Sequence, residues 1–310
     1  MYDAVLLIGF GGPTCMDEVR PFLADVARGR GISAERLETV VHHYERIGGK
    51  SPFNELTLRQ AAALEAELRA GGMPMPVYVG LRSWHPYLRE TLARMGGDGV
   101  RRALGLIMAP QQNDAGWYRY QRDTEAARAQ VGAAAPRVDY AGEWHAHPLF
   151  IDAEREIIAP ALAASAAGLA PEQAGKTFLI FTAHSIPVAM AKDSPYVEQI
   201  IEAAGKIAAA VGHPHWVLAY QSRSGRPTDP WLAPDVCDVI RTLAADRVRR
   251  VVVAPIGFVC DHVEVLYDLD IEAQQVATEV GVEFVRASTV NDHPQFIRML
   301  ADVVRRSTHA

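Results

Sequence analysis

Residues 251–272 read V-V-V-A-P-I-G-F-V-C-D-H-V-E-V-L-Y-D-L-D-I-E. The stretch opens with a short apolar, β-branched run that has the length of a buried strand, and Gly257 then permits a turn. A helical pattern follows from residue 262, with Asp261 placed to cap it. A buried strand that leads through a turn into a helix is the building unit of parallel sheets covered by helices on both faces.

The same alternation of short apolar runs and longer amphipathic runs continues along the whole chain. It predicts strands at residues 4–9, 77–80, 103–109, 138–141, 177–182, 217–221, 251–255 and 283–286. It predicts helices at residues 16–27, 34–46, 55–70, 86–95, 118–131, 151–167, 196–211, 234–245, 262–280 and 294–305. We therefore predict an α/β fold with two similar doubly wound domains, each a four-stranded parallel sheet flanked by helices.

The chain divides near its midpoint. The Ala-rich stretch 159–174 marks the join, and we place the N-terminal domain at residues 1–150 and the C-terminal domain at residues 151–310. A weak internal echo supports two similar halves, because the third predicted strand of each half ends in Ala-Pro. Doubly wound sheets bind ligands beyond the carboxyl ends of their strands, so we expect an active-site cleft between the two domains.

The composition is that of a soluble globular protein, with 49% hydrophobic and 22% charged residues. A net charge of -6 argues against a nucleic-acid surface, and no apolar run is long enough to span a membrane. The N-terminus leads into the first predicted strand without the basic region of a signal peptide.

Cys15, Cys237 and Cys260 are too widely spaced for a disulfide framework or a zinc or iron–sulfur motif. We expect a reducing, cytoplasmic setting.

Three carboxylates recur at a spacing of four residues in the quoted stretch: Glu264, Asp268 and Glu272. On a helix this spacing places them on one face, about 6 Å apart along the axis. Such a row of like charges costs helix stability, but it offers the hard oxygen ligands that divalent cations prefer. The alternative, a solvated acidic face, stays open from this stretch alone.

His184 follows the fifth predicted strand, at the carboxyl end where the ligand sites of doubly wound sheets lie. An imidazole suits proton transfer or metal ligation, whereas a lone histidine is more often structural. Glu264 follows the seventh predicted strand, at the same edge of the same sheet. The order of the strands therefore predicts a His184–Glu264 pair, with Asp268 and Glu272 leading away from it as a path for a divalent metal.

Three segments in the N-terminal half allow both a structural and a ligand-binding interpretation. The glycine-rich turn at residues 9–13 lacks the spacing of a dinucleotide-binding motif. Basic residues within 28–31 and 42–52 suit the C-termini of helices, or a substrate that carries carboxylates. The aromatic residues within 117–120 suit a flat ligand and a protein core equally.

Six stretches, taken together and in order, resemble the ferrochelatase family, and the resemblance covers nearly the whole chain. They are G-F-G-G-P at 9–13, H-Y-E-R-I-G-G-K-S-P at 43–52, F-T-A-H-S-I-P at 181–187, Y-Q-S-R-S-G at 220–225, P-W-L-A-P at 230–234 and P-I-G-F-V-C-D-H-V-E-V-L-Y-D-L-D at 255–270. The chain is most similar to the coproporphyrin ferrochelatases of Gram-positive and actinobacterial type.

The resemblance implies two Rossmann-like, chelatase-like domains that bind no nucleotide. It implies a lyase of haem biosynthesis that inserts Fe(II) into a porphyrin, with coproporphyrin III as the expected substrate. Iron is then a substrate, no cofactor is required, and no cysteine follows Cys260 to hold the [2Fe–2S] cluster of some actinobacterial relatives. We expect a monomer whose partners are porphyrin and Fe(II), with no nucleic acid.

The resemblance also implies roles for individual residues. His184 and Glu264 match the family's inner metal-site pair and are the expected catalytic residues. Asp268 and Glu272 match a line of carboxylates that binds hydrated cations, so all four side chains are expected metal ligands. It stays open whether His184 or Glu264 accepts the pyrrole proton. The expected porphyrin contacts are Phe10, Arg28, Tyr44, Ser51 and Tyr120.

Three positions depart from the pattern of the relatives. Phe10 stands where many relatives carry a tyrosine that can approach the iron, and because Phe cannot ligate, we expect only apolar contact with the macrocycle. Ala27 stands where some relatives have a propionate-binding arginine, and Arg28 is its neighbour. The polar segment 111–114 replaces the small and aromatic residues expected after the third strand.

Three alternatives remain beside insertion of iron into coproporphyrin III. The substrate can instead be protoporphyrin IX. A non-catalytic porphyrin or haem carrier would keep the cleft but would not need the acidic line. A cobalt or nickel chelatase would act on a more reduced tetrapyrrole.

Overall fold

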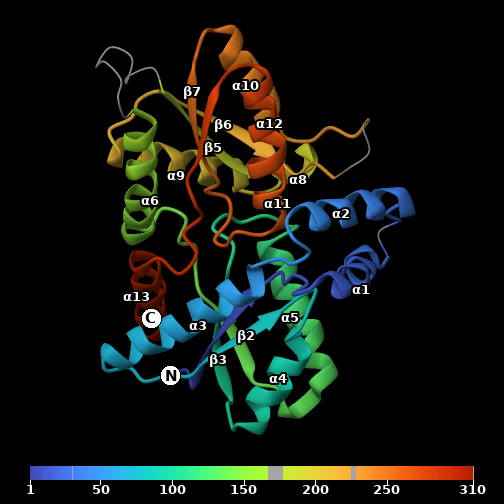
Figure 1. Ribbon diagram of the computed structural model, residues 1–310. Helices are drawn as coiled ribbons and strands as arrows, with labels where there is room; N and C mark the ends of the chain where they lie inside the picture. The colour runs from blue at the N-terminus through green and yellow to red at the C-terminus, as the bar shows by residue number, and fades with distance from the viewer. Residues whose placement is uncertain (30, 167–176, 225–227, 310) are drawn as a thin grey trace. The chain divides into compact units, whose positions relative to one another are not determined.

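The computed structural model describes residues 1–29, 31–166, 177–224 and 228–309, and these divide into two compact units (Figure 1). Unit 1 comprises Met1–Pro110, Asp114–Trp144 and Asn291–Ala310, and unit 2 comprises Gln111–Asn113 and His145–Val290. Within the described residues, each unit contains one parallel sheet of four strands. The predicted α/β fold with two helix-flanked sheets is therefore confirmed.

The sheet of unit 1 is built around its first strand. Its strands are β1 (Ala4–Gly9), β2 (Val77–Leu81), β3 (Arg102–Ile107) and β4 (Arg137–Tyr140), in the order β2-β1-β3-β4. All of β1 is buried, because it pairs with β2 on one side and β3 on the other. The helical elements are α1 (Met16–Ala27), α2 (Ala34–Arg46), α3 (Phe53–Ala70), α4 (Leu88–Gly97), α5 (Trp117–Val131), the 3₁₀ turn η1 (Gly132–Ala134) and α13 (Pro294–His309).

The sheet of unit 2 repeats this topology. Its strands are β5 (Thr177–His184), β6 (Trp216–Gln221), β7 (Arg250–Ala254) and β8 (Glu283–Arg286), in the order β6-β5-β7-β8. The valines of β7 are fully buried, as expected of an inner strand covered on both faces. The helical elements are α6 (Pro148–Ala166), α8 (Val188–Lys192), α9 (Tyr196–Ala210), α10 (Val236–Ala245), α11 (Val263–Leu266), the π-helix η2 (Asp268–Ala273) and α12 (Gln274–Glu279).

The prediction of one continuous helix over residues 262–280 is wrong. The segment consists of the short helix α11, the π-helix η2 and the helix α12. The backbone N–H of Glu272 donates to the carbonyl of Tyr267, five residues earlier, at 3.0 Å, so this turn contains one residue more than an α-helical turn. The hydrophobic pattern does not reveal an extra residue of this kind, because the apolar positions on either side still face the core.

The residue ranges of the two units differ from those of the two predicted domains. The main part of unit 2 begins at His145, and the last helix, α13, belongs to unit 1. Phe296, Leu300 and Val304 of α13 are fully buried, and α13 packs against α3. Arg59 of α3 also pairs with Asp292 at 2.6 Å. Of the Ala-rich stretch taken as the join, residues 159–166 lie inside α6, and residues 167–174 lie outside the described residues.

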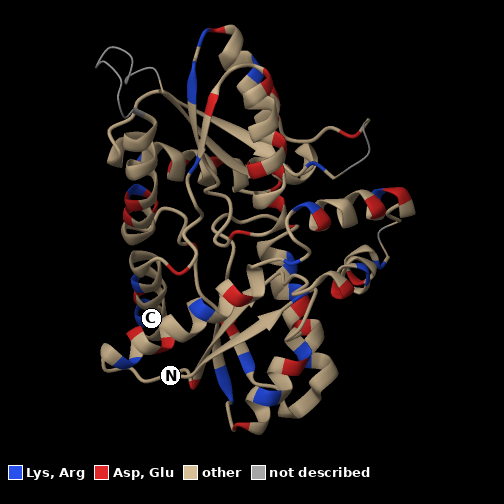
Figure 2. Ribbon diagram, in the orientation of Figure 1, with Lys and Arg blue, Asp and Glu red and all other residues tan. Residues whose placement is uncertain are grey.

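Acidic and basic residues are mixed over the described elements of both units (Figure 2). Many of the basic residues are paired with carboxylates, such as Arg82 with Asp123 at 2.6 Å. Among the helices of the described residues, none has the length and apolar character that a membrane span requires.

Candidate active site

His184 is the last residue of β5, two residues beyond the predicted end of that strand. Its place in the sheet is fixed by pairing with Gln221 of β6, and its carbonyl accepts a hydrogen bond from the Tyr196 hydroxyl at 2.9 Å. The imidazole Nδ1 faces the carbonyl oxygen of Ser185, which can only accept. Nδ1 therefore carries a hydrogen, and Nε2 is the ring atom directed at Glu264.

A close approach of two backbone segments brings Glu264 to His184. Gly257 N donates to the carbonyl of Thr182 at 3.1 Å, so the loop after β7 lies against the end of β5. A Cβ added at Gly257 would lie 2.7 Å from both Cα and Cβ of Ala183. Glycine is therefore required at this position, and the loop that it permits leads directly into α11.

Glu264, near the start of α11, lies between two imidazoles. Its Oε1 is 3.4 Å from His184 Nε2, and its Oε2 is 3.2 Å from His262 Nε2. The backbone carbonyl of Glu264 accepts a hydrogen bond from Gln221 Nε2 at 2.6 Å. The predicted His184–Glu264 pair is present in the structure, and His262 joins it as a third member.

The charges of His184 and Glu264 stabilise each other. Burial lowers the pKa of His184, but the Glu264 carboxylate and the Ser185 carbonyl outweigh burial and raise that pKa to about 9. Burial raises the pKa of Glu264, but the two imidazoles outweigh it and hold that pKa well below its usual range. The pair therefore carries an ionised carboxylate and a protonated imidazole near neutral pH, and one proton has to leave before His184 Nε2 can act as a base or a ligand.

Asp268 is the first residue of η2, one turn beyond Glu264. Ser222, directly after β6, has a φ of 62°, which is uncommon for a residue other than glycine, and its Oγ donates to Asp268 Oδ2. Burial is the main reason that the pKa of Asp268 rises to about 7, and the Glu264 and Glu272 carboxylates raise it further. Asp268 therefore changes its charge close to neutral pH.

The π-helix keeps Glu264, Asp268 and Glu272 closer to one side of the segment than a continuous α-helix would. Four residues of an α-helix make 400°, so residues at a spacing of four drift by about 40° around the axis with each step. The turn from Asp268 to Glu272 contains an extra residue, and four residues there complete slightly less than a full turn. The drift from Glu264 to Asp268 is therefore reversed in the next step.

The five expected porphyrin contacts all belong to unit 1, and the structure links some of them. The Phe10 and Tyr44 rings each make an edge contact with Phe22 of α1, with centroids 6.2 Å apart in both pairs. Ser51 is buried against Gly12, where an added Cβ would lie 2.9 Å from Ser51 Oγ.

Two of these five positions have other surroundings. Tyr120 lies on α5 and is buried. Arg28 lies at the C-terminal end of α1, with a highly exposed side chain that pairs with Asp25.

The comparison with protein families identifies the chain. The family model described as Ferrochelatase matches residues 2–308. The chain belongs to the ferrochelatase family. Within that family, a coproporphyrin III ferrochelatase of Mycolicibacterium smegmatis is 42% identical over 99% of this chain and 90% of its own length. A ferrochelatase of Rhodopirellula baltica is 41% identical over 98% of this chain and 86% of its own length.

A solved structure supports the fold of this ferrochelatase-family chain. The sirohydrochlorin chelatase SirB of Bacillus subtilis subspecies spizizenii, in complex with cobalt, matches 100% of this chain and 96% of its own, with a TM-score of 0.57. The two sequences are 11% identical, so the likeness concerns the fold alone. The expected chelatase-like fold is confirmed.

Sequence reasoning missed two polar residues near the acidic line of this ferrochelatase-family chain. The helical pattern predicted from residue 262 gives His262 no role at the site, although it lies beside Glu264. Ser222 has no predicted role of its own, although it contacts Asp268. His262 follows β7 and Ser222 follows β6, and both lie beyond the carboxyl ends of strands in one parallel sheet. Ligand sites of such sheets lie at this edge, so the position of the two residues in the sequence could have indicated that they belong to the site.

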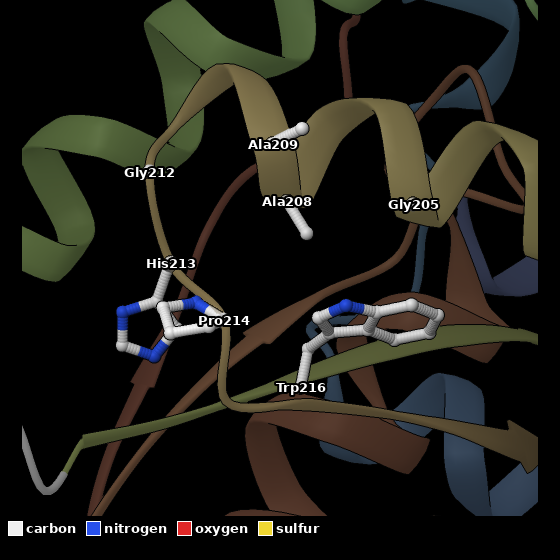
Figure 3. Close-up of a pocket in the computed structure, with 7 residues that line it drawn as sticks. All are labelled: Gly205, Ala208, Ala209, Gly212, His213, Pro214 and Trp216. Atoms are coloured by element: carbon white, nitrogen blue, oxygen red, sulfur yellow. The ribbon is translucent and has the colours of Figure 1, made fainter.

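The hollow drawn in Figure 3 lies away from these residues, where β6 begins rather than where it ends. It has a volume of about 470 Å³ and is lined by Gly205, Ala208, Ala209, Gly212, His213, Pro214 and Trp216. Ala208 and Ala209 project from the end of α9 above the His213 and Trp216 rings (Figure 3). His213 Nε2 faces the Thr177 carbonyl at 2.9 Å, so one nitrogen of this lining imidazole holds the local backbone.

Proposed function

We propose that the protein inserts Fe(II) into a porphyrin in haem biosynthesis, and that the porphyrin is coproporphyrin III. The observation that carries the proposal is the His184–Glu264 pair at the end of an inner strand, with Asp268 one turn further along. The family membership supports the reaction, and the name of the Mycolicibacterium smegmatis relative supports the substrate.

Insertion requires that two pyrrole N–H protons leave while one Fe(II) enters. A cation that approaches Glu264 lowers the affinity of His184 for its proton, because that affinity depends on the Glu264 carboxylate. The neutral Nε2 can then accept a pyrrole proton while the carboxylate binds the metal, or Nε2 can bind the metal while the carboxylate accepts the proton. The two groups are so close that they titrate as one unit, so the division of these tasks belongs to the pair.

We propose that Asp268 and Glu272 bind the cation before it reaches this pair. Carboxylates hold hard cations through coordinated water, and a cation near Asp268 favours its ionised form. Among the described residues, no three histidine, cysteine or acidic side chains form a ready metal site. Weak holding by few ligands suits a cation that passes along the protein, since the porphyrin supplies the final nitrogen ligands.

We propose that Phe10, Tyr44, Ser51 and Tyr120 contact the porphyrin and that Arg28 binds one of its carboxylates. Phe10 supplies apolar ring surface, and the exposed Arg28 guanidinium suits a carboxylate. The cleft expected between the two halves stays a prediction. We also propose that the protein works as a monomer in the cytoplasm and needs no iron–sulfur cluster.

The substrate is tested by the relative kcat/KM for coproporphyrin III and protoporphyrin IX, with Fe(II) under anaerobic conditions. We expect a higher kcat/KM for coproporphyrin III, because its four carboxylates can bind basic residues that the two of protoporphyrin IX cannot fully use. An equal value or a preference for protoporphyrin IX would contradict the assignment of the substrate. Porphyrin binding without insertion of any metal would instead favour the carrier.

A further inference from the structure

We propose that Arg286 and Asp270 are positioning residues that hold the π-helix η2, so that Asp268 and Glu272 keep the orientation in which they receive a cation. The inference rests on the proposed function, because it assigns these two residues a part in metal delivery. Neither residue belongs to the His184–Glu264 pair or to the acidic line itself.

One guanidinium holds the segment at two points. Arg286, the last residue of β8, binds Asp270 of η2 through two parallel hydrogen bonds, with Nη2 to Oδ2 at 2.9 Å. Its Nη1 also donates to Oδ1 of Asp261, directly before His262, at 3.1 Å. Asp261 Oδ1 accepts a further hydrogen bond from the Thr289 hydroxyl at 3.1 Å.

These contacts are largely removed from water. The side chains of Arg286 and Asp261 are 16% and 17% exposed, and that of Asp270 is 32% exposed. A bidentate arginine–carboxylate pair fixes direction as well as distance, and partial burial strengthens it. Arg286 therefore anchors the start of the segment, beside His262, and its π-turn at the same time.

The segment needs an anchor because its own backbone holds it weakly. The helix α11 spans only Val263–Leu266, and isolated helices of this length are unstable in water. The π-turn that follows is a rare backbone form, and Glu264, Asp268 and Glu272 repel one another along one side. Without a fixed point on the sheet, this repulsion would favour a different turn.

Asp270 lies on a different side of η2 from Asp268 and Glu272, so it can have a different role. Residues two positions apart on a helix face different sides, so Asp270 faces away from the side shared by Asp268 and Glu272. Its charge is neutralised by Arg286, whereas Asp268 meets the Ser222 hydroxyl. One carboxylate of the turn, that of Asp270, is thus used for anchoring.

A matched control lies at the other end of the same strand. Arg250 of β7 pairs with Glu283, the first residue of β8, at 2.8 Å. This pair also joins β8 to a neighbour by an arginine–carboxylate contact, but it does not involve η2 or the loop before α11. Loss of the Glu283 carboxylate therefore reports what any ion pair of β8 contributes to stability.

The test compares Asp270→Asn with Glu283→Gln in the full chain. Binding of Co²⁺ alone is measured by calorimetry, porphyrin binding by quenching of tryptophan fluorescence, and insertion by steady-state kinetics. We expect Asp270→Asn to weaken Co²⁺ binding and to raise the KM for the metal about tenfold, with the KM for porphyrin unchanged. Arg286→Lys keeps the charge but loses the paired hydrogen bonds, and should show a smaller change in the same direction.

A double variant tests whether Asp270 acts through Asp268. The Asp268→Ala, Asp270→Asn double variant should lose less Co²⁺ affinity than the sum of the two single losses, because one of the two positioned carboxylates is already absent. Fully additive losses would overturn the inference, as would a metal KM that Asp270→Asn changes no more than Glu283→Gln does. If the wild-type protein inserts no iron and Asp270→Asn still weakens Co²⁺ binding, the proposed function fails while the positioning role stands.

Discussion

At Glu264 one carboxylate serves two imidazoles, 3.4 Å from His184 Nε2 and 3.2 Å from His262 Nε2. The charge of Glu264 therefore depends on both rings, and each ring is oriented by a backbone carbonyl at its other nitrogen. Replacing one imidazole leaves the carboxylate paired with the other. The structure thus allows the function of His184 to be removed without leaving an isolated charge.

His184→Ala should abolish iron insertion while porphyrin binding persists. The variant loses the base or ligand at the reacting centre, and loss of a positioned proton-transfer group costs at least about a hundredfold in rate. The measurement is kcat with coproporphyrin III and Fe(II), with quenching of tryptophan fluorescence by porphyrin as the test of binding. His213→Ala, in the hollow at the other end of the sheet, is the control and should turn over normally. Wild-type turnover of His184→Ala would contradict the role given to this residue.

The pairing of His184 with Glu264 could be predicted from the sequence, but the part of His262 could not. Both paired residues lie at the carboxyl ends of neighbouring inner strands, so strand order alone brings them together. His262 precedes a helix, where a residue is usually interpreted as a cap. Its ring is turned toward Glu264 by the Cys260 carbonyl, and a contact of this kind depends on the folded loop.

At the scale of elements, the strands could be predicted almost to the residue and the π-helix could not. Buried strands of parallel sheets are continuous apolar runs, and residues 4–9, which are all buried, carry the bounds expected of such a strand. The bounds of the edge strand at residues 283–286 also agree with the prediction. The extra residue in η2 has no local signal, since its neighbours keep a helical pattern. Its anchor is Arg286 on β8, which follows Asp270 by 16 residues and lies in a different element, so helical spacing does not indicate this contact.

The loop between β7 and α11 gives a prediction at the scale of elements. Gly257→Ala should lower both stability and insertion, because the new Cβ would lie 2.7 Å from Ala183 and force the loop away from β5. We expect a loss of about 1–3 kcal/mol in the free energy of unfolding, measured with urea. Gly205→Ala in α9 is the matched control, because an added Cβ there meets nothing within 4 Å. It should be neutral or stabilising, by up to about 1 kcal/mol. Equal effects of the two substitutions would contradict the close packing at Gly257.

At the scale of the whole molecule, one topology is used twice with different side chains. The sheets have the orders β2-β1-β3-β4 and β6-β5-β7-β8, in which each strand of unit 1 has its counterpart in unit 2. Unit 2 carries His184, Glu264 and Asp268 after its inner strands, whereas unit 1 carries the aromatic and hydroxyl groups assigned to porphyrin. Two four-stranded parallel sheets could be predicted from the alternation of strands and helices, but the order of the strands within each sheet was not predicted. The place of α13 in unit 1 could not, because it depends on packing against α3 from the opposite end of the sequence.

The stability of the whole chain should depend on pH through Glu154. This side chain on α6 is 2% exposed, its Oε1 has no hydrogen-bond partner among the described residues, and burial raises its pKa from 4.5 to about 8. A pKa that is higher in the folded chain means that ionisation opposes folding. The cost is absent below pH 4.5, grows up to pH 8 and is constant above it.

Glu154→Gln should therefore stabilise the protein at pH 9 and have little effect at pH 4. Each unit of pKa shift corresponds to about 1.4 kcal/mol, so we expect a gain of a few kcal/mol at the higher pH. Denaturant unfolding at the two pH values provides the measurement. Glu156→Gln, on the same helix with a side chain 37% exposed, should give no comparable gain. A gain from Glu154→Gln that is equal at both pH values would contradict the ionisation argument.

The division of the chain has a consequence for the order in which the protein forms during synthesis. The chain changes unit after Pro110, Asn113, Trp144 and Val290, and α13 returns to unit 1 at the very end of the described sequence. All residues of unit 2 are synthesised before α13, since unit 2 ends at Val290 and α13 begins at Pro294. Unit 1 therefore starts first and is completed only after unit 2 has been synthesised, and the part of α3 that packs against α13 stays uncovered until then.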